Sequence, residues 1–242
     1  MFKILSSLKG FKPKSLLDIG ANQGNFALSI KKNIPSVKLF YLIEANVNCE
    51  NVLKKLPFEY EICLLSNLEE EKKFYLNPKN NICTGSSYYI ENTKHFERDK
   101  FQKIKSTTLD KVLVKRNFSF DLVKLDTQGS ELDILKGATE TLKKAKYIII
   151  ECNTNEESFN EGAPSEEEIS NFLFSKGFKN KLLLEQHLWV DKKHVSFKYG
   201  DVFQNDYLFS RQKIRKSFYL KLTYFSNFLK IFFMKFKRKL NF

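Results

Sequence analysis

LLDIGANQGNF, residues 16–26, is the most informative segment of this chain. A short apolar run carries an acid near its end, and a turn with two glycines then leads into a helical pattern. A second apolar run, Leu42-Ile43-Glu44, follows and also ends in an acid. Ligands of open α/β sheets bind outside the carboxyl ends of the strands, where an acid can accept hydrogen bonds from a ribose. The two segments together predict a nucleoside pocket.

The spacing of the glycines indicates which nucleoside this pocket binds. A dinucleotide fingerprint needs G-x-G-x-x-G, which brings a pyrophosphate onto the N-terminus of a helix. The glycines here are Gly20 and Gly24. Asn22 and Asn25 stand where the other two would be needed. The pattern suits a ligand without a pyrophosphate, such as S-adenosylmethionine, and favours a methyltransferase over a dehydrogenase. The alternative is an ordinary strand-to-helix turn in which Asp18 caps the helix.

The positive charge of the chain is concentrated at its C-terminal end. The formal net charge of the 242 residues is +13, and ten basic residues without any acid lie in 211–242, so residues 1–210 carry only +3. The length and the 42% apolar content fit one α/β domain with an appendage. We expect a lead-in over residues 1–13, a main domain over 14–211 and a basic aromatic tail over 212–242. Four scattered cysteines and no signal peptide pattern favour the reducing cytoplasm.

Apolar runs alternate with helical patterns, which is typical of βαβ units and a mainly parallel sheet with helices on both faces. The predicted strands are Ser15–Ile19, Leu39–Ile43, Glu61–Leu65, Phe120–Leu125, Tyr147–Glu151, Leu182–Val190 and Val202–Ser210. The predicted helices are Gly24–Asn33, Asn46–Leu56, Ser130–Lys143 and Ser165–Lys176. Between residues 72 and 109 we expect a hairpin or excursion from the sheet, where a substrate lid would be useful.

A second chemical motif is KLDTQGSELDILKGA, residues 124–138. Its apolar strand brings Asp126 to the same end of the sheet as the first turn. Methyl transfer to a hydroxyl needs in-line placement and a group that takes the proton, so Asp126 is a candidate general base. The alternative is that Asp126 caps the following helix.

Several segments, taken together, resemble the FkbM-type methyltransferases in order and spacing. They are residues 18–24, Ile43-Glu44, Thr108-Leu109-Asp110, residues 124–138 and Ile150-Glu151, with Ser86-Ser87 and residues 206–209 as weaker features. The resemblance covers about residues 14–211. It implies a class I, Rossmann-like methyltransferase fold, S-adenosylmethionine as cofactor, and O-methylation, commonly of sugar or natural-product hydroxyls.

The resemblance also implies that Gly20, Asn22 and Glu44 hold the cofactor, with Ser66 near the adenine. The complete set of expected cofactor-binding residues is Asp18, Gly20, Ala21, Asn22, Gly24, Glu44, Ala45, Ser66 and Asp126. Leu65-Ser66-Asn67 offers no acid to the adenine amine, so that contact is expected from the backbone.

Two further residues are candidates for catalysis beside Asp126. Glu151 ends a strand and faces either the substrate or the following loop, while His95 lies in the excursion. Convergence of Asp126, Glu151 and His95 would give a magnesium site, but their spacing does not require one and we expect no metal. His187 and His194 flank a strand turn and are expected to be solvated.

The tail forms a basic amphipathic helix. One apolar line steps by three and four residues, and it consists of Phe218, Leu222, Phe225, Leu229, Phe232 and Phe236. Lys221 and Lys230 interrupt the apolar run, which argues against a membrane-spanning helix. A helix rich in phenylalanine and lysine suits an anionic membrane surface. The alternative is packing on the body or on a second subunit.

The sequence as a whole therefore predicts an S-adenosylmethionine-dependent O-methyltransferase. Its expected substrate is a sugar hydroxyl of a glycan, a glycolipid or a related small-molecule metabolite. We expect the enzyme in the cytoplasm, with its tail at the inner face of the membrane. One alternative is a nucleic-acid methyltransferase, which the basic tail favours, although residues 1–210 carry no basic stripe. The other is a non-catalytic domain that binds a nucleoside or a membrane.

Overall fold

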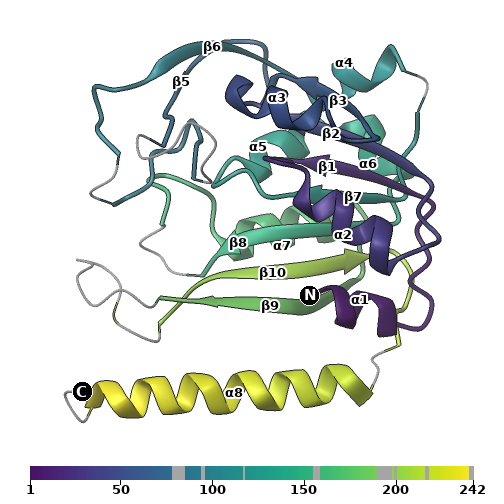
Figure 1. Cartoon of the computed structure of the whole chain (residues 1–242), viewed down its shortest axis with the longest axis vertical. Helices are drawn as coiled ribbons and strands as arrows, with labels where there is room; N and C mark the ends of the chain where they lie inside the picture. The colour runs from purple at the N-terminus through teal and green to yellow at the C-terminus, as the bar shows by residue number, and fades with distance from the viewer. Residues whose placement is uncertain are drawn as a thin grey trace.

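The computed structural model describes residues 1–77, 85–93, 96–116, 118–154, 159–189, 198, 201–215 and 218–239. These residues form a seven-stranded sheet with helices on both faces, a three-stranded sheet and a long C-terminal helix (Figure 1). The expected fold class, a mainly parallel α/β sheet between two helical layers, is confirmed. The three described cysteines, Cys49, Cys63 and Cys152, are free thiols.

The large sheet reverses its direction of growth next to its first strand. Its order is β3-β2-β1-β7-β8-β10-β9, and the first five of these strands are parallel. The parallel strands are β1 (Ser15–Ile19), β2 (Leu39–Glu44), β3 (Glu59–Ile62), β7 (Leu122–Leu125) and β8 (Tyr147–Asn153). The switch point between β1 and β7 is the place where open α/β sheets bind ligands.

The last two strands are antiparallel and close one edge of the sheet. They are β9 (Asn180–Leu188) and β10 (Val202–Ser210). In their register Asp206 lies opposite Glu151 on β8 and opposite Glu185 on β9. Three carboxylates on neighbouring strands are thereby placed side by side.

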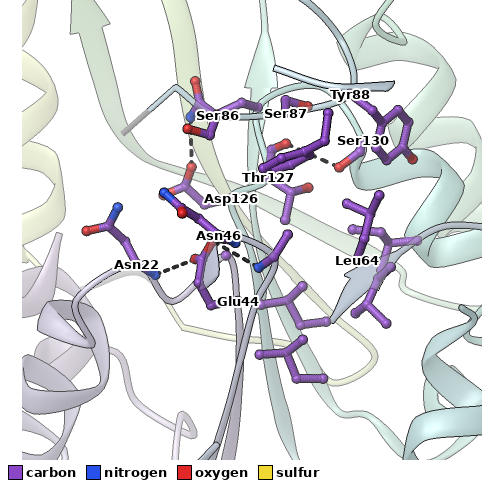
Figure 2. Close-up of a pocket in the computed structure, with 18 of the residues that line it drawn as sticks. Asn22, Glu44, Asn46, Leu64, Ser86, Ser87, Tyr88, Asp126, Thr127 and Ser130 are labelled. Carbon is purple, nitrogen blue, oxygen red and sulfur yellow. Dashed lines mark hydrogen bonds between the residues drawn. The ribbon is translucent and has the colours of Figure 1, made fainter. Parts of the chain in front are cut away.

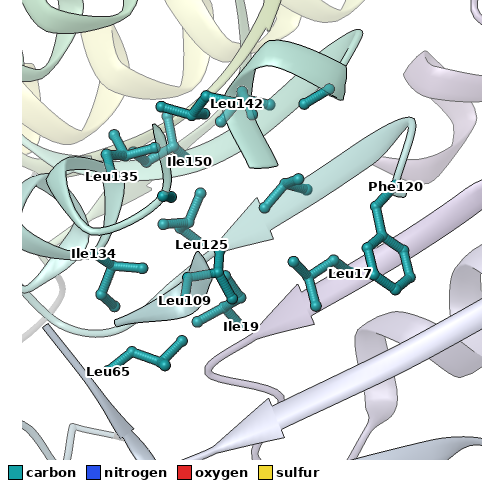
Figure 3. Close-up of a cluster of buried hydrophobic side chains, with 14 of the residues drawn as sticks. Leu17, Ile19, Leu65, Leu109, Phe120, Leu125, Ile134, Leu135, Leu142 and Ile150 are labelled. Carbon is teal, nitrogen blue, oxygen red and sulfur yellow. The ribbon is translucent and has the colours of Figure 1, made fainter. Parts of the chain in front are cut away.

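Each face of the sheet is covered by its own group of helices. One group is α1 (Phe2–Ser7), α2 (Asn25–Asn33) and α3 (Glu50–Leu53), with the 3₁₀ turn η1 (Val47–Cys49) before α3. The other group is α4 (Leu109–Val114), α5 (Glu131–Lys136), α6 (Thr139–Lys144) and α7 (Glu166–Ser175). Figure 3 shows the second core, in which β1, β7 and β8 contact α4, α5 and α6. Because both faces are covered, β1 and β7 are buried along their whole length.

The single helix expected over residues 130–143 is two helices. α5 ends at Lys136, α6 begins at Thr139, and Gly137 lies between them. A Cβ atom on Gly137 would lie 2.4 Å from the carbonyl oxygen of Ser66. The backbone approaches the strand ends here more closely than an uninterrupted helix with side chains allows, so the expectation of one helix was wrong.

The excursion expected after residue 72 forms the small sheet. β5 (Glu71–Phe74) pairs antiparallel with β6 (Gln102–Thr107), and β6 also pairs in parallel with β4 (Leu64–Leu65). Two tyrosines in the connection between β5 and β6, Tyr88 and Tyr89, donate hydrogen bonds to the Asp133 carboxylate on α5. The excursion is therefore attached to the large sheet's helical layer beside the switch point.

The C-terminal helix α8 (Phe218–Lys239) packs on the body through one face. Leu220 is fully buried in the core, the Tyr224 hydroxyl donates to the Leu183 carbonyl at 2.6 Å, and Arg238 pairs with Asp201 at 2.8 Å. Figure 1 shows α8 alongside β9. None of the described helices is long and apolar enough to cross a membrane.

The opposite face of α8 carries the apolar line expected from the sequence, and this face is exposed. Its large side chains have exposed fractions of 36–64%, and they are Leu222, Phe225, Phe228, Leu229, Phe232, Phe233 and Phe236. The helix thus packs on its own body, which was one alternative for the tail, and the exposed aromatic residues take no part in that packing.

Candidate active site

The turn after β1 brings its backbone against the end of β7. Gly20 has φ = +71°, and a Cβ atom there would lie only 1.9 Å from the carbonyl oxygen of Asp126. The Gly20 amide donates to the Ile43 carbonyl at 3.0 Å, and the Asp126 amide donates to the Ile19 carbonyl at 3.2 Å. Only glycine fits this position, because a side chain would have to displace the end of β7.

Glu44 ends β2 with its carboxylate tied to the surrounding backbone. Oε2 accepts from the Asn22 amide at 2.7 Å, and Oε1 accepts from the amides of Ala45 and Asn46 at 2.9 and 2.8 Å. Burial nevertheless raises the pKa of Glu44, because these hydrogen bonds offset only part of the desolvation. The three bonds fix the orientation of the carboxylate before any ligand is bound.

A cleft of about 660 Å³ opens beside Glu44, across the switch point (Figure 2). Its polar wall comes from the turns after β1, β2 and β7. Its apolar wall comes from Ile43, Leu64, Leu65 and Ile134. Phe74 and residues 85–88 close the remaining side, so the excursion lines the cleft as a lid would.

Lys124 provides a buried positive charge beneath the mouth of the cleft. Its Nζ lies 3.0 Å from the Gly20 carbonyl, 3.4 Å from Asp18 Oδ1 and 3.2 Å from Asp126 Oδ2. Burial alone would raise the pKa of Asp126, but the Lys124 charge and a hydrogen bond from Gln128 outweigh burial and lower it. Asp126 is therefore ionised at neutral pH. The pKa of the fully buried Asp18 is raised, because burial outweighs Lys124 there.

A second cavity of about 730 Å³ adjoins the cleft, and Asp126 lines both. We call it the acidic pocket, and its charged or titratable lining groups are the amino group of Met1 and the side chains of Lys124, Asp126, Glu151, Glu185, His187 and Asp206. The Gln128 amide bridges the two regions, since it donates to Asp126 at 3.0 Å and to Glu151 at 2.9 Å. His187 Nε2 lies 3.0 Å from Asp206 Oδ2 and 3.8 Å from Glu151 Oε1.

Two acids of this pocket, Glu151 and Asp206, hold their protons more firmly than usual. Burial raises the pKa of Glu151 well above its ordinary value, and the neighbouring charges of Asp126 and Asp206 add to the shift. Burial also raises the pKa of Asp206. The hydrogen bond with Asp206 raises the pKa of His187. The pocket thus combines the ionised Asp126 with two acids that favour neutralisation by a proton or a cation.

The expected site residues fall into four groups. Those that line the cleft are Gly20, Asn22, Glu44, Ala45 and Asp126. Those that do not line it are Asp18, Ala21, Gly24 and Ser66, of which Asp18 and Ser66 have no exposed surface. Glu151 lines the acidic pocket instead. His95 and His194 lie outside the described residues.

Sequence reasoning missed His187 and Asp206 as site residues. His187 was expected to be solvated, but its ring is hydrogen-bonded to Asp206 and lines the pocket, so that expectation was wrong. Gln128 was also given no role. The amide in the motif around Asp126 was the one available signal, because the sequence predicts the two strands β9 and β10 but not their register.

A sequence profile of the methyltransferase FkbM domain matches residues 18–179, which is more than half of the chain. The chain belongs to this family. The expected family and the expected methyltransferase activity are thereby confirmed, and S-adenosylmethionine is the cofactor. A search of the curated proteins finds no match.

Several solved structures of methyltransferases are similar to the chain, one of them with a TM-score above 0.5. Methyltransferase FkbM from Methylobacillus flagellatus is similar, with 14% identity, a TM-score of 0.51 and coverage of 85% of this chain but only 47% of that protein. A putative RNA methyltransferase from Pyrococcus horikoshii has 13% identity, a TM-score of 0.45 and coverage of 86% and 80% of the two chains. TrmK from M. capricolum, solved with S-adenosylhomocysteine, has 14% identity, a TM-score of 0.45 and coverage of 83% and 63%.

Proposed function

We propose that this methyltransferase acts on a hydroxyl group of a sugar, in a glycan, a glycolipid or a related metabolite. The observation that carries the proposal is the acidic pocket, which meets the cleft at Asp126. Carboxylates accept hydrogen bonds from hydroxyl groups, which a sugar presents in number. The same carboxylates repel phosphates, so the pocket is poorly suited to a nucleic-acid backbone.

The residues of the cleft fit S-adenosylmethionine. Glu44 is fixed by three backbone amides, which leaves one of its about four lone-pair sites, on Oε2, for a hydroxyl of a ribose. The apolar wall around Leu64 and Ile134 is suited to an adenine ring. Gly20, where a side chain is excluded, and the carboxylate of Asp126 would hold the amino-acid end. We assign Asn22 and Ala45 to the same site, because their backbone amides hold the Glu44 carboxylate in place.

When bound, the cofactor supplies a methyl group that is activated by a positively charged sulfur. The chain's own task is to align the acceptor oxygen and to receive its proton. We assign the proton to the Asp126 carboxylate, because it is ionised and lines both cavities. Gln128 fixes the carboxylate toward Glu151 through its two hydrogen bonds.

A methylation assay tests the substrate class. Full-length protein is incubated with an isotope-labelled methyl donor and, in parallel, with a glycolipid fraction, a soluble glycan fraction and total RNA. We expect label in a glycan or glycolipid, located on a sugar oxygen by mass spectrometry. Label in RNA alone would support the nucleic-acid alternative. Binding of S-adenosylhomocysteine with no labelled product in any fraction would support the non-catalytic alternative.

We further propose that α8 holds the enzyme at an anionic membrane surface on the cytoplasmic side. The supporting observation is the division of labour between its two faces: one packs on the body, while the aromatic line is exposed. Lys221, Lys230 and Lys235 are exposed next to this line. Aromatic insertion together with lysines near headgroups, each worth about 1 kcal/mol, is typical of interfacial helices.

Two variants separate membrane binding from folding. Phe225, Leu229 and Phe232 changed together to serine should abolish binding to anionic liposomes and leave the Tm unchanged, because all three are exposed. Leu220→Ala should do the reverse, with a loss of about 2–4 kcal/mol in unfolding free energy, because Leu220 is fully buried. Liposome binding of the unaltered chain should also fall with salt. Binding that survives the triple substitution would contradict the proposal.

A further inference from the structure

Three side chains of the acidic pocket bring one potential ligand atom each to a common point. They are Glu151 on β8, His187 on β9 and Asp206 on β10, and their ligand atoms all lie within 4.8 Å of one another. The three strands are adjacent in the sheet (Figure 1). Rigid elements thus supply all three groups, which is the usual support of a metal site.

The spacing of these atoms matches metal coordination. A divalent ion with bonds of about 2.1 Å to nitrogen and oxygen places neighbouring octahedral ligands about 3.0 Å apart and opposite ligands about 4.2 Å apart. His187 Nε2 lies 3.0 Å from Asp206 Oδ2 and 3.8 Å from Glu151 Oε1. An ion in place of the histidine proton would contact all three atoms with only small side-chain shifts.

A hydrogen bond from Gln128 orients the Glu151 carboxylate toward His187. The Gln128 amide holds Oε2 of Glu151, which leaves Oε1 on the side of His187. Orientation of a ligating carboxylate by a neighbouring hydrogen bond is typical of metal sites. Gln128 therefore has a positioning role for this site as well as for Asp126.

The charge balance also calls for a cation. Lys124 is already shared by Asp18 and Asp126, and the amino group of Met1 is paired with Glu185 at 3.3 Å. Within the described residues, no lysine or arginine forms an ion pair with Glu151 or Asp206. Their only ionic partner there is a shared imidazole. Two buried carboxylates without a full positive charge are unfavourable, and a divalent ion would remove this cost.

We propose that Glu151, His187 and Asp206 bind one first-row divalent cation in the acidic pocket. Two carboxylates suit Mg²⁺ and Mn²⁺ and one imidazole suits Fe²⁺, Ni²⁺ and Zn²⁺, so the mixed set fits a first-row divalent ion, for which Mn²⁺ is the spectroscopic probe. The pocket is open on the remaining side, so adjacent oxygens of an acceptor can complete the coordination. The role toward the acceptor rests on the proposed function; the binding of the ion does not.

Electron paramagnetic resonance tests the site directly. Metal-stripped full-length protein is titrated with Mn²⁺, and the loss of the free-ion signal gives the stoichiometry and the Kd. We expect one tightly bound ion per chain, and Asp206→Asn and His187→Gln should weaken binding at least about 100-fold. Glu185→Gln removes a carboxylate from the same pocket without removing a ligand, and Glu185 is half-exposed and screened by water, so the Kd should change by less than about tenfold.

Two parallel measurements keep the outcomes distinct. Circular dichroism and calorimetry with S-adenosylhomocysteine report whether each variant is folded and binds the cofactor product. A folded Asp206→Asn variant that binds Mn²⁺ like the unaltered chain, or an unaltered chain that binds none, would overturn the cation site. Failure to bind S-adenosylhomocysteine would count against the proposed function and not against the cation site.

Discussion

The cleft and the acidic pocket lie at the same end of one sheet, yet they treat their carboxylates in opposite ways. In the cleft, Glu44 accepts hydrogen bonds from three backbone amides. Glu131, at the start of α5, likewise accepts from the amides of Thr127 and Gly129 at 2.6 and 2.9 Å. In the acidic pocket, Glu151 and Asp206 instead share the ring of His187.

The difference follows from strand direction. Parallel strands end in turns toward helices, and such turns have backbone amides without ladder partners that a carboxylate can accept from. β10 runs antiparallel between β8 and β9, so the amides around Asp206 are used in the sheet. Carboxylates there must find side chains, protons or a ligand. One end of one sheet therefore provides a preformed cleft and, beside it, a pocket whose charges are still unbalanced.

The largest effect is expected where the two regions meet. Asp126→Asn should lower turnover by about 10²–10⁴-fold, the usual contribution of general base catalysis, while most of the affinity for S-adenosylhomocysteine is retained, because the asparagine oxygen still accepts a hydrogen bond from its amino group. Rate measurements at saturating acceptor and calorimetry distinguish the two. Full activity would leave Asp126 as a structural partner of Lys124 and Gln128.

Disrupting the close approach of Gly20 to the end of β7, where the cleft and the acidic pocket meet, should strongly destabilise the protein. Gly20→Ala places a methyl group 1.9 Å from the Asp126 carbonyl oxygen at a positive φ, so we expect a loss of about 3 kcal/mol or more in unfolding free energy. Gly162→Ala is the matched control, because its φ is also positive and its nearest atom lies 3.9 Å away. We expect a cost of about 1 kcal/mol there. Equal denaturation midpoints would contradict the close approach.

The contrast between the two kinds of carboxylate predicts that one substitution is harmful and the other favourable: loss of Glu44 should weaken ligand binding, whereas loss of the Glu151 carboxyl should stabilise the fold. Glu44→Ala should weaken binding of S-adenosylhomocysteine by about 1–3 kcal/mol, because the ribose loses a charged acceptor and three amides lose theirs. Glu151→Gln in metal-free protein should raise the unfolding free energy by about 1 kcal/mol, because it removes one of several like charges. Calorimetry and thermal unfolding measure both. Destabilisation by Glu151→Gln would remove the contrast.

The smallest expected effect is a pH dependence from Glu131. Burial raises its pKa to about 7, against 4.5 for the ordinary carboxyl. Between these values the native chain keeps the proton and the unfolded chain has lost it, so stability falls as pH rises. From pH 6 to pH 8 we expect a loss of about 1 kcal/mol. Glu131→Gln should flatten this slope in urea unfolding; an unchanged slope would assign it to other groups.

Local patterns predicted the parallel half of the molecule well. β1 begins and ends where its apolar run does, and Glu44 lies in the cleft as its position after Leu42-Ile43 implied. The break at Gly137 was missed because its cause is the Ser66 carbonyl, which is distant in the sequence. His187 was missed for the same kind of reason, since its neighbours depend on the register of β9 and β10.

The two faces of α8 also show what the spacing of apolar residues along a helix can and cannot predict. The spacing of Phe225, Leu229 and Phe232 correctly placed them on one side of a helix. It did not reveal a second face that contacts the body, on which Leu220, Tyr224 and Met234 follow one another after four and ten residues. Which of two apolar faces is buried depends on the shape of the partner surface, which the helix itself does not encode.

The attachment of α8 also limits how far an acceptor can be from its anchor. The last turn of the helix is fixed by Arg238 to Asp201, next to the start of β10, and β10 begins beside the end of β8 where the acidic pocket opens. A surface that receives the aromatic line would lie roughly one helix diameter, about 10 Å, from the edge of the sheet. An enzyme held in this way would select acceptors by the distance between the acceptor sugar and the surface of the bilayer. Sugars close to their lipid would be within reach, and the outer residues of a long chain would pass beyond the site.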